Sequence, residues 1–283
     1  MPPRQAPTAR QLRLGLELRK LRERAGLTAR EAGELIGANQ ARISNIETGR
    51  FGLSEQRVRT LAHNYGCQDS SLVDALVSMT GKQQRGWWEE YRGILPASQL
   101  DLAEVEHFAT SVRVGNVLHI PGPLQTVDHA RALFAEGVPP MPPPDVEHRV
   151  SFRIKRQEIL YREQPVPYRS VVHEAALRMR FGGTRTSRAQ LAHLLEMSER
   201  DNITLRTIPF SNGVFPGSGQ SVNYFTGAVR QLDTVQLDQS HGTLLLDAEA
   251  QLAKYRLLLD RMEATALPPE ESRDFILSLI REL

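Results

Sequence analysis

The sequence contains a single cysteine, Cys67, among 283 residues. One thiol can form neither an intrachain disulfide nor a thiolate cluster for zinc. The chain also lacks an apolar run of about 20 residues, the length that a membrane-spanning helix needs. Its first residues, Met1-Pro-Pro-Arg, lack the apolar segment of a secretory signal peptide. These absences predict a cytoplasmic protein with no membrane partner.

The common signatures of enzymes and metal proteins are missing as well. The eight histidines show no pair at helical spacing with a carboxylate between them. The glycines at 182–183 and 213–219 lack the strand–turn–helix context of a phosphate or dinucleotide loop, and no serine lies in a nucleophile elbow. We therefore expect no catalytic residue, no metal and no cofactor.

Charge is distributed unevenly along the chain. Residues 1–60 carry 12 Arg and Lys against 6 Asp and Glu, a net charge of +6, while the remainder carries 23 against 27, a net charge of −4. With 283 residues, the chain also exceeds the usual size of one domain. A basic first part and a slightly acidic second part predict two domains, of which the first binds nucleic acid.

Residues 28–50 have the pattern of a helix, a tight turn and a second helix. Thr28 with Glu31 three positions later is a capping box, and Gly37 can adopt the left-handed conformation that ends a helix. Asn39 can cap the helix that follows. The inward positions are expected to be Ala32, Leu35 and Ile36 on the first helix, and Ile43 and Ile46 on the second.

The outer face of the second helix is polar. A short helix that presents amide, guanidinium and hydroxyl groups can read base edges in a DNA major groove. An ordinary αα-hairpin is the alternative, because it also has a glycine turn and polar outer faces. The candidate base-reading positions are Gln40, Ala41, Arg42, Ser44 and Asn45.

Apolar stripes predict further helices on both sides of this hairpin, over residues 11–25, 54–65 and 70–79. Five short helices within residues 10–80 predict an all-α helix-turn-helix domain. The proline-rich residues 1–9 are expected to form a disordered arm in front of it.

Within residues 12–66, one set of helix caps, core positions and turn residues recurs in a known family: Leu27-Thr28, Ala32, Leu35, Gly37, Gln40, Ile43-Ser44, Ile46-Glu47, Gly49, Leu61 and Tyr65-Gly66. With these residues, the segment resembles the helix-turn-helix of XRE-type (Cro/C1-like) transcriptional regulators. The resemblance implies that Gln40, at the head of the recognition helix, touches bases or phosphates and that Glu47 holds the following loop. Ala29 stands where that family usually has a glutamine that grips the DNA backbone.

Helix ends and loops in this region are candidate phosphate contacts. Hydroxyls, cations and exposed amides at such places can bind phosphate oxygens. These contacts give affinity and salt dependence but carry no sequence information. The candidates are Thr28, Arg30, Asn39 and Arg50.

Residues 81–99 are expected to form a linker with an aromatic segment, and residues 100–283 a second domain. Helices are predicted over residues 100–112, 128–134, 146–162, 174–179, 187–200, 247–264 and 270–281. Strands are predicted over residues 112–120, 166–173, 203–209, 222–225 and 235–237. This mixture predicts an α+β or α/β domain with a small mixed sheet.

The second part contains several short motifs that occur together in a known family: Trp87-Trp88 with Tyr91, Pro121-Gly122-Pro123-Leu124-Gln125-Thr126 with Ala130-Arg131, Arg153 through Arg156-Gln157, His173-Glu174-Ala175, Gln190-Leu191, Pro209-Phe210, Tyr255-Arg256 and Leu267. With these motifs, about residues 87–282 resemble the C-terminal DUF5753 (Scr1-type, antitoxin-like) domain of actinobacterial XRE-like regulators. This resemblance implies a regulator often encoded beside a small partner protein.

A polar pocket in the second domain is a weaker prediction. Glu174 at a strand end could meet Arg153 and Arg156 from a nearby helix, either as a structural ion pair or as an effector pocket. Gln125 could line that pocket or satisfy backbone groups of a rigid loop.

Three functions remain open at this point. The first is a nucleoid-associated transcriptional regulator that binds an inverted repeat of double-stranded DNA as a homodimer, with a second domain that dimerises or senses a ligand or partner. The second is a small-molecule receptor or enzyme with a DNA-binding head. The third is an antitoxin-like member of a two-protein module.

Overall fold

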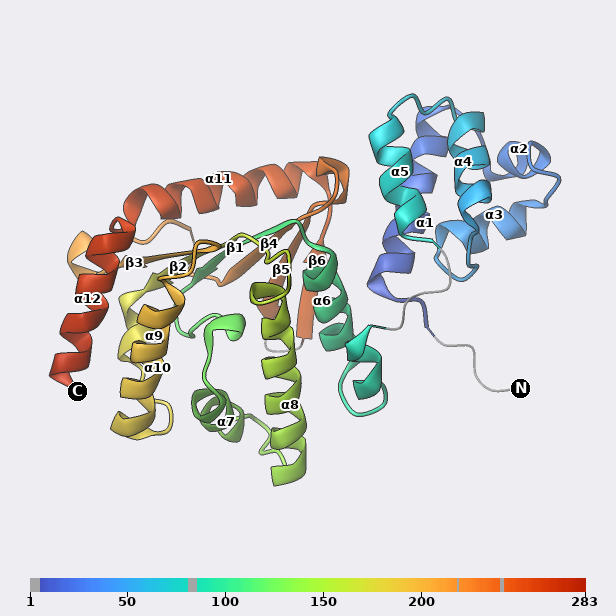
Figure 1. The fold of residues 1–283 in the computed structure, drawn as a ribbon. Coiled ribbons are helices and arrows are strands. Elements are labelled where there is room, and N and C mark those ends of the chain that lie inside the picture. The colour runs from blue at the N-terminus through green and yellow to red at the C-terminus, as the bar shows by residue number, and fades with distance from the viewer. Residues whose placement is uncertain (1–5, 81–85, 218, 240–241) are drawn as a thin grey trace. The chain divides into compact units, whose positions relative to one another are not determined.

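The computed structural model describes residues 6–80, 86–217, 219–239 and 242–283. It divides into two compact units: Met1–Glu90 with Ala228–Leu232, and Tyr91–Gly227 with Asp233–Leu283 (Figure 1). Within the described ranges, no helix has both the length and the apolar character needed to cross a membrane.

The first unit is a bundle of short helices, as expected. Its core contains the apolar faces of all five, including Leu18, Ile43, Val58, Leu61 and Leu76. A side chain accepts a hydrogen bond at the N-terminus of each helix, which satisfies backbone amides that have no partner within the helix. The helices are α1 (Ala9–Arg24), α2 (Ala29–Glu34), α3 (Gln40–Glu47), α4 (Glu55–Asn64) and α5 (Ser70–Ser78).

Two local expectations for this unit need correction. Leu35, expected inside, is 51% exposed, because α2 ends at Glu34 and Leu35 lies in the turn that follows. Of the arm expected over residues 1–9, residues 1–5 lie outside the described residues. Its last part belongs to the fold, since Thr8 forms a capping box with Gln11 and α1 begins at Ala9.

The second unit contains a six-stranded mixed sheet with the order β3-β2-β1-β4-β5-β6. Strands β1, β2 and β3 are parallel, whereas β4 is antiparallel to β1, β5 to β4 and β6 to β5. The strands are β1 (Ser111–Asn116), β2 (Tyr168–His173), β3 (Ile203–Ile208), β4 (Val222–Thr226), β5 (Thr234–Gln239) and β6 (Gly242–Leu246).

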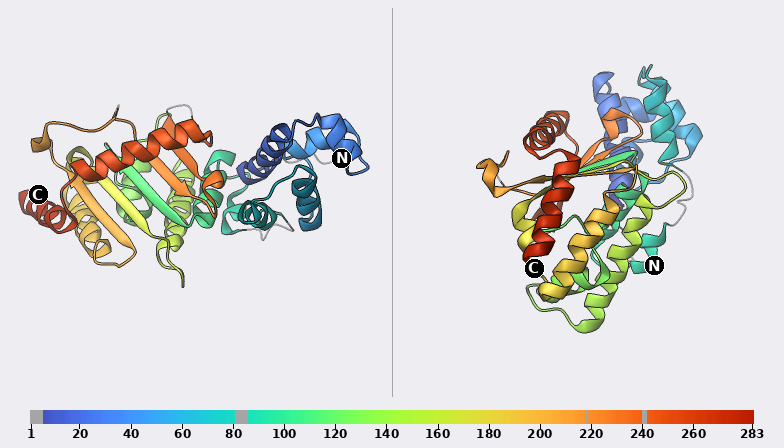
Figure 2. Two further views of the ribbon diagram at one scale, coloured as in Figure 1. Left: turned by 90° about the horizontal axis from the view of Figure 1, so that it is seen from above. Right: turned by 60° about the vertical axis from the view of Figure 1, so that its left-hand side comes forward.

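Helices cover both faces of this sheet, as the views in Figures 1 and 2 show. Helix α11 lies along one face, where Leu252, Leu259 and Met262 pack on strand residues such as Val171 and Val235. The other helices form a thicker layer on the opposite face. They are α6 (Ala97–Phe108), α7 (Val127–Ala135), α8 (Pro143–Lys155), α9 (Glu174–Arg178), α10 (Gly183–Met197) and α12 (Pro269–Glu282), with α11 at Glu249–Thr265.

Short 3₁₀ turns of the second unit lie at Gly122–Leu124, Arg156–Leu160 and Phe210–Asn212. The turn at Arg230–Leu232 belongs to the first unit, and the turn at Trp87–Tyr91 spans the boundary after Glu90. The sequence predicts a single helix over residues 146–162. In the structure α8 ends at Lys155, and the 3₁₀ turn at Arg156–Leu160 follows it. Residues 81–85 of the expected linker lie outside the described residues, and α6 begins within its last part at Ala97. The ring of Tyr91 packs edge-on against Phe152 at 5.0 Å between centroids.

Candidate nucleic-acid interface

Helices α2 and α3 are joined by a tight turn that the sequence specifies locally. The Thr28 Oγ accepts a hydrogen bond from the Glu31 amide at 3.2 Å, and the Thr28 amide donates to the Glu31 carboxylate at 2.7 Å. Gly37 has a φ of 63°, a conformation that side chains with a Cβ rarely adopt. The Asn39 Oδ1 then accepts from the Arg42 amide at 2.9 Å and starts α3. The chain therefore passes from α2 to α3 within a few residues.

Helix α3 presents a polar surface and buries an apolar one. Ile43 and Ile46 are 1% and 2% exposed and anchor the helix in the core. Arg42 differs from its neighbours, because it is half-buried and its Cζ lies 4.2 Å from the centroid of the Phe51 ring. This cation–π contact restrains the guanidinium. The exposed predicted base-reading residues are Gln40, Ala41, Ser44 and Asn45.

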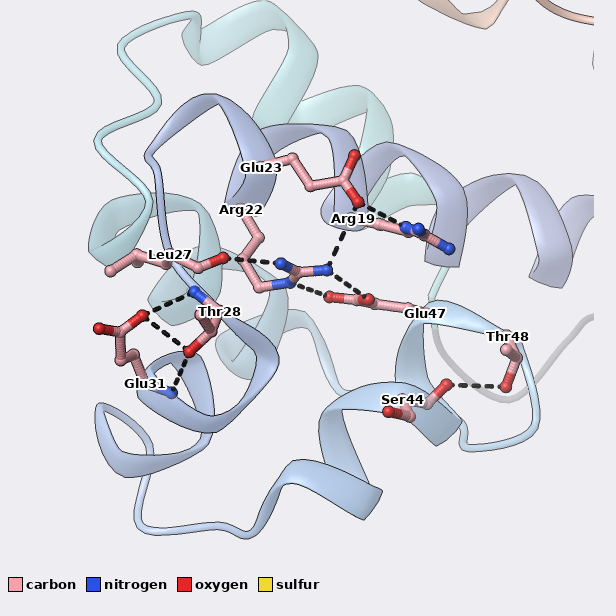
Figure 3. Close-up of polar contacts among 9 residues, drawn as sticks. All are labelled: Arg19, Arg22, Glu23, Leu27, Thr28, Glu31, Ser44, Glu47 and Thr48. Atoms are coloured by element: carbon pink, nitrogen blue, oxygen red, sulfur yellow. Dashed lines mark hydrogen bonds and ion pairs between the residues drawn. The ribbon is translucent and has the colours of Figure 1, made fainter.

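A buried ion pair fixes the end of α3 (Figure 3). From α1, the Arg22 guanidinium contacts both carboxylate oxygens of Glu47, with the Nε–Oε1 distance at 2.5 Å and the Nη2–Oε2 distance at 3.0 Å. The Arg22 Nη1 also donates to the Leu27 carbonyl at 2.7 Å, just before α2. The hydrogen bond to Glu47 raises the pKa of Arg22. One guanidinium therefore joins α1, the start of α2 and the end of α3.

Close backbone approach reinforces this arrangement. Gly15 lies in α1 where a Cβ would come within 2.6 Å of the Ile46 carbonyl oxygen and 2.5 Å of that of Glu47. Such distances are far below van der Waals contact, so only glycine permits α1 to pack this closely on the end of α3.

The predicted phosphate contacts lie at the surface of the same region. Thr28, Arg30, Asn39 and Arg50 are all exposed. The Thr28 hydroxyl donates to Glu31 at 2.7 Å, so its own proton already has an acceptor. The Arg30 Nε lies 3.1 Å from Glu34, and both side chains are mostly exposed, so solvent screens this pair.

Comparison with known families gives two matches. Residues 13–76 match a family described as a helix-turn-helix domain, and residues 99–278 match one described as "Domain of unknown function (DUF5753)". The second match spans more than half of the chain. The chain belongs to the DUF5753 family. Comparisons with curated proteins and with solved structures gave no match.

The helix-turn-helix match contains α2, α3 and the Arg22–Glu47 pair. Helix α3 is the second helix of this pair, the position that the recognition helix occupies in helix-turn-helix domains. Sequence reasoning identified its exposed side chains but missed Arg22 and Phe51. The only sequence signal for Arg22 is its position on α1. It follows the buried Leu18 by four residues and the buried Leu21 by one, which places it beside the buried face of that helix.

The DUF5753 domain brings together three of the four predicted pocket residues. Gln125, Arg153 and Arg156 line a cleft of about 740 Å³. Glu174 is not among its lining residues and pairs instead with the Arg178 Nε at 2.5 Å and the Phe210 amide at 2.6 Å. The expected pairing of Glu174 with Arg153 and Arg156 is therefore wrong. Glu174 is the first residue of the short helix α9, directly after strand β2. Its carboxylate therefore reaches Arg178 in the same helix and the Phe210 amide in the turn after β3.

Gln125 has the structural role that its loop predicts. The Gln125 Nε2 donates to the Ile120 carbonyl at 2.7 Å, and the Gln125 backbone carbonyl accepts from the Gln157 Nε2 at 2.7 Å. The Gln190 side chain holds the same loop through the Leu124 carbonyl and the Thr126 amide, both at 2.8 Å. These bonds make one wall of the cleft rigid. Across the described parts of the chain, no group of three His, Cys, Asp or Glu side chains could hold a metal ion.

Proposed function

We propose that this protein is an XRE-type transcriptional regulator that reads specific DNA sequences with α3. The observation that carries the proposal is the surface of α3, on which Gln40, Ser44 and Asn45 are exposed while Ile43 and Ile46 hold the helix in the core. Amide and hydroxyl groups can hydrogen-bond to base edges in the major groove. A helix fixed by a buried ion pair presents these groups in one arrangement, as sequence discrimination requires.

Arg42 completes this surface in a restrained form. Its guanidinium stacks on Phe51, and a stacked guanidinium keeps its N–H donors at its edge. Arginine donors pair well with the O6 and N7 atoms of guanine. We therefore assign a guanine contact to Arg42 and adenine or backbone contacts to Gln40 and Asn45.

Around the recognition helix, Arg30, Arg50, Asn39 and Thr28 are assigned to phosphate contacts. They are exposed at helix ends and in the following loop, where contacts to phosphate position the protein without reading sequence. The net charge of +6 over residues 1–60 supports this assignment.

We further propose that the protein binds as a homodimer and that the DUF5753 domain dimerises, senses a small ligand or partner protein, or does both. It is assigned no catalytic role. A two-fold dimer would place its recognition helices about 34 Å apart, one turn of DNA, and would select an inverted repeat.

Genome-wide mapping of the bound sites tests this function. The proposal predicts a shared inverted repeat among the bound sites, with half-site centres about one helical turn apart. Binding scattered without a shared sequence, or no binding above that of the Gln40→Ala variant, would overturn it.

A further inference from the structure

The cleft in the DUF5753 domain lies where the strand order of the sheet reverses. Strands β2 and β3 continue from one side of β1, and the antiparallel strands β4, β5 and β6 from the other. The cleft opens beside Asn116, at the carboxyl end of β1, on the face covered by α6, α8 and the turn at Gly122–Leu124. Such reversal points are the usual ligand sites of open sheets with helices on both faces. A volume of about 740 Å³ also suits a small molecule.

Arg153 is the unusual side chain of this cleft. Its Nη1 donates to the Gln125 Oε1 at 2.8 Å, and its Cζ lies 4.8 Å from the centroid of the Phe134 ring. A Cβ on Gly122 would come within 3.1 Å of the same Nη1, so the loop backbone lies directly against the guanidinium. Arg153 is thus held on several sides by neutral groups.

The charge of Arg153 has no carboxylate partner among the described residues. The neighbouring Arg156 is neutralised by Glu106 through two hydrogen bonds of 2.6 Å. Burial lowers the pKa of Arg153 to about 9, although Glu106 and Asp238 attract its charge. Burial acts in the same direction on Arg156, but there the paired Glu106 prevails and the pKa is raised. Arg153 is half-buried and its direct contacts are with neutral groups, so an anion that enters the cleft and pairs with the guanidinium would offset the cost of partly burying its charge.

Two strand residues that line the cleft have side-chain oxygens that can accept hydrogen bonds from a ligand. The Asn116 Oδ1 is buried and has no hydrogen-bond partner. Asp238 also lines the cleft, where its Oδ1 accepts from the Gln236 side chain at 2.5 Å. Since a buried acceptor without a donor costs free energy, a hydroxyl or amino group on the ligand fits this side.

The balance of charges selects the class of anion. Arg156 is paired with Glu106, whereas Arg153 forms no ion pair among the described residues, and Asp238 adds one negative charge that attracts Arg153 from a distance. A phosphate monoester, with close to two charges, would therefore be repelled by Asp238 after its first charge is matched. A single carboxylate matches the guanidinium in charge and shape. Apolar walls at Leu102, Ile120 and Leu133 suit a hydrocarbon portion.

We propose that this cleft binds a small organic acid that carries one carboxylate and a hydroxyl or amino group. The carboxylate pairs with Arg153, the donor group hydrogen-bonds to the Asn116 Oδ1, and the hydrocarbon portion packs on the apolar walls. The inference names the ligand class for the sensing role proposed above and rests on that role for its regulatory consequence alone. Binding is measured without DNA, so the two proposals fail separately.

The test is a thermal-shift screen of the full-length protein. The probes are hydroxy- and amino-monocarboxylic acids of graded size, each with its primary amide and with a phosphate monoester of similar size. An acid present at about 100 times its Kd should raise Tm by about 5 °C, while its amide leaves Tm unchanged. No response to any acid, equal responses to the amides, or responses to the phosphate esters alone would overturn the proposal.

Two variants locate the site. Arg153→Gln should abolish the response to every acid, whereas Arg180→Gln, which alters an exposed arginine outside the cleft, should keep it. Asn116→Leu should lower the affinity for hydroxy and amino acids at least tenfold but spare acids that lack these groups. Since this variant keeps Arg153, it serves even if Arg153→Gln fails to fold. An unchanged acid response in Arg153→Gln, or equal losses for both kinds of acid in Asn116→Leu, would contradict the proposed geometry.

Discussion

Arg22 and Glu47 are the two side chains on which the recognition helix depends most. Both side chains are 9% exposed, and they join α1 to the end of α3. Removal of one partner from a buried pair leaves the other charge without compensation, which is far more costly than removal of both.

Glu47→Gln should therefore lower the free energy of unfolding of the helix-turn-helix domain by about 3–5 kcal/mol, because Arg22 stays charged and buried. Urea denaturation followed by circular dichroism measures this loss. Glu34→Gln is the matched control, since it removes a carboxylate from an exposed pair on α2 and should leave stability unchanged. Equal stability of the two variants would show that the Arg22–Glu47 pair does not fix α3.

Arg50 separates affinity from specificity at the scale of one side chain. It is exposed in the loop after α3, and we assign it to a phosphate contact and not to base reading. Arg50→Ala should weaken binding to all DNA sequences alike and reduce the slope of log K against log salt by about 1. Fluorescence anisotropy at a series of salt concentrations measures both. A loss confined to the cognate sequence would instead assign Arg50 to base reading.

At the scale of single elements, α7 contains a histidine buried without hydrogen bonds. His129 is 2% exposed, neither ring nitrogen has a partner among the described residues, and its ring packs edge-on against Phe181 at 5.7 Å. Burial lowers the pKa of His129 to about 4, and Arg153 and His119 add to this effect. His129 is thus neutral in the folded protein at pH 7.

This low pKa makes stability depend on pH in one direction. Between about pH 6.5 and 4, His129 binds a proton in the unfolded chain but not in the folded protein. The unfolded state is therefore stabilised relative to the folded state as the pH falls. The contribution of His129 is complete above pH 6.5, and up to about 3 kcal/mol is lost on acidification to pH 4. His129→Leu should flatten this part of the stability profile, whereas the exposed His63→Leu should not. An unchanged profile in His129→Leu would refute the assignment.

The elements also show which features can be predicted from the sequence. Local signals were reliable: the caps at Thr28 and Asn39 and the turn at Gly37 lie where the pattern placed them. The prediction that Leu35 is buried was wrong, because it assumed a helix that continues through Leu35, whereas α2 ends at Glu34.

Features that depend on distant partners were predicted less well. Strand β6 was missed, since residues 242–246 do not alternate and acquire their structure only by pairing with β5. Glu174 was assigned to the wrong arginine, because no local pattern reveals that Arg178 and the Phe210 amide reach it first. Asn116 was missed for the same reason. A polar residue at a strand end was its only signal, and the cleft beside it is formed by segments from five other regions of the chain.

At the scale of the whole molecule, the two units have separate cores. The helices of residues 9–78 enclose one core, and the sheet of the DUF5753 domain packs helices on each face. A chain that lacks residues 1–90 should therefore lose DNA binding yet keep the secondary structure and cooperative unfolding of the DUF5753 domain. Circular dichroism and a gel-shift assay on this truncated chain measure the two properties. Retained operator binding would contradict the assignment of α3 as the reading element.

The central claim is that the exposed face of α3 reads DNA sequence, and the affinity of Gln40→Ala for the mapped operator tests it most directly. Gln68→Ala is the matched control, because Gln68 is an exposed glutamine outside α2 and α3. We predict that Gln40→Ala loses about 1–3 kcal/mol of operator binding and retains its non-specific binding and its fold. Gln68→Ala should match the wild type. Wild-type operator affinity in Gln40→Ala would contradict the account.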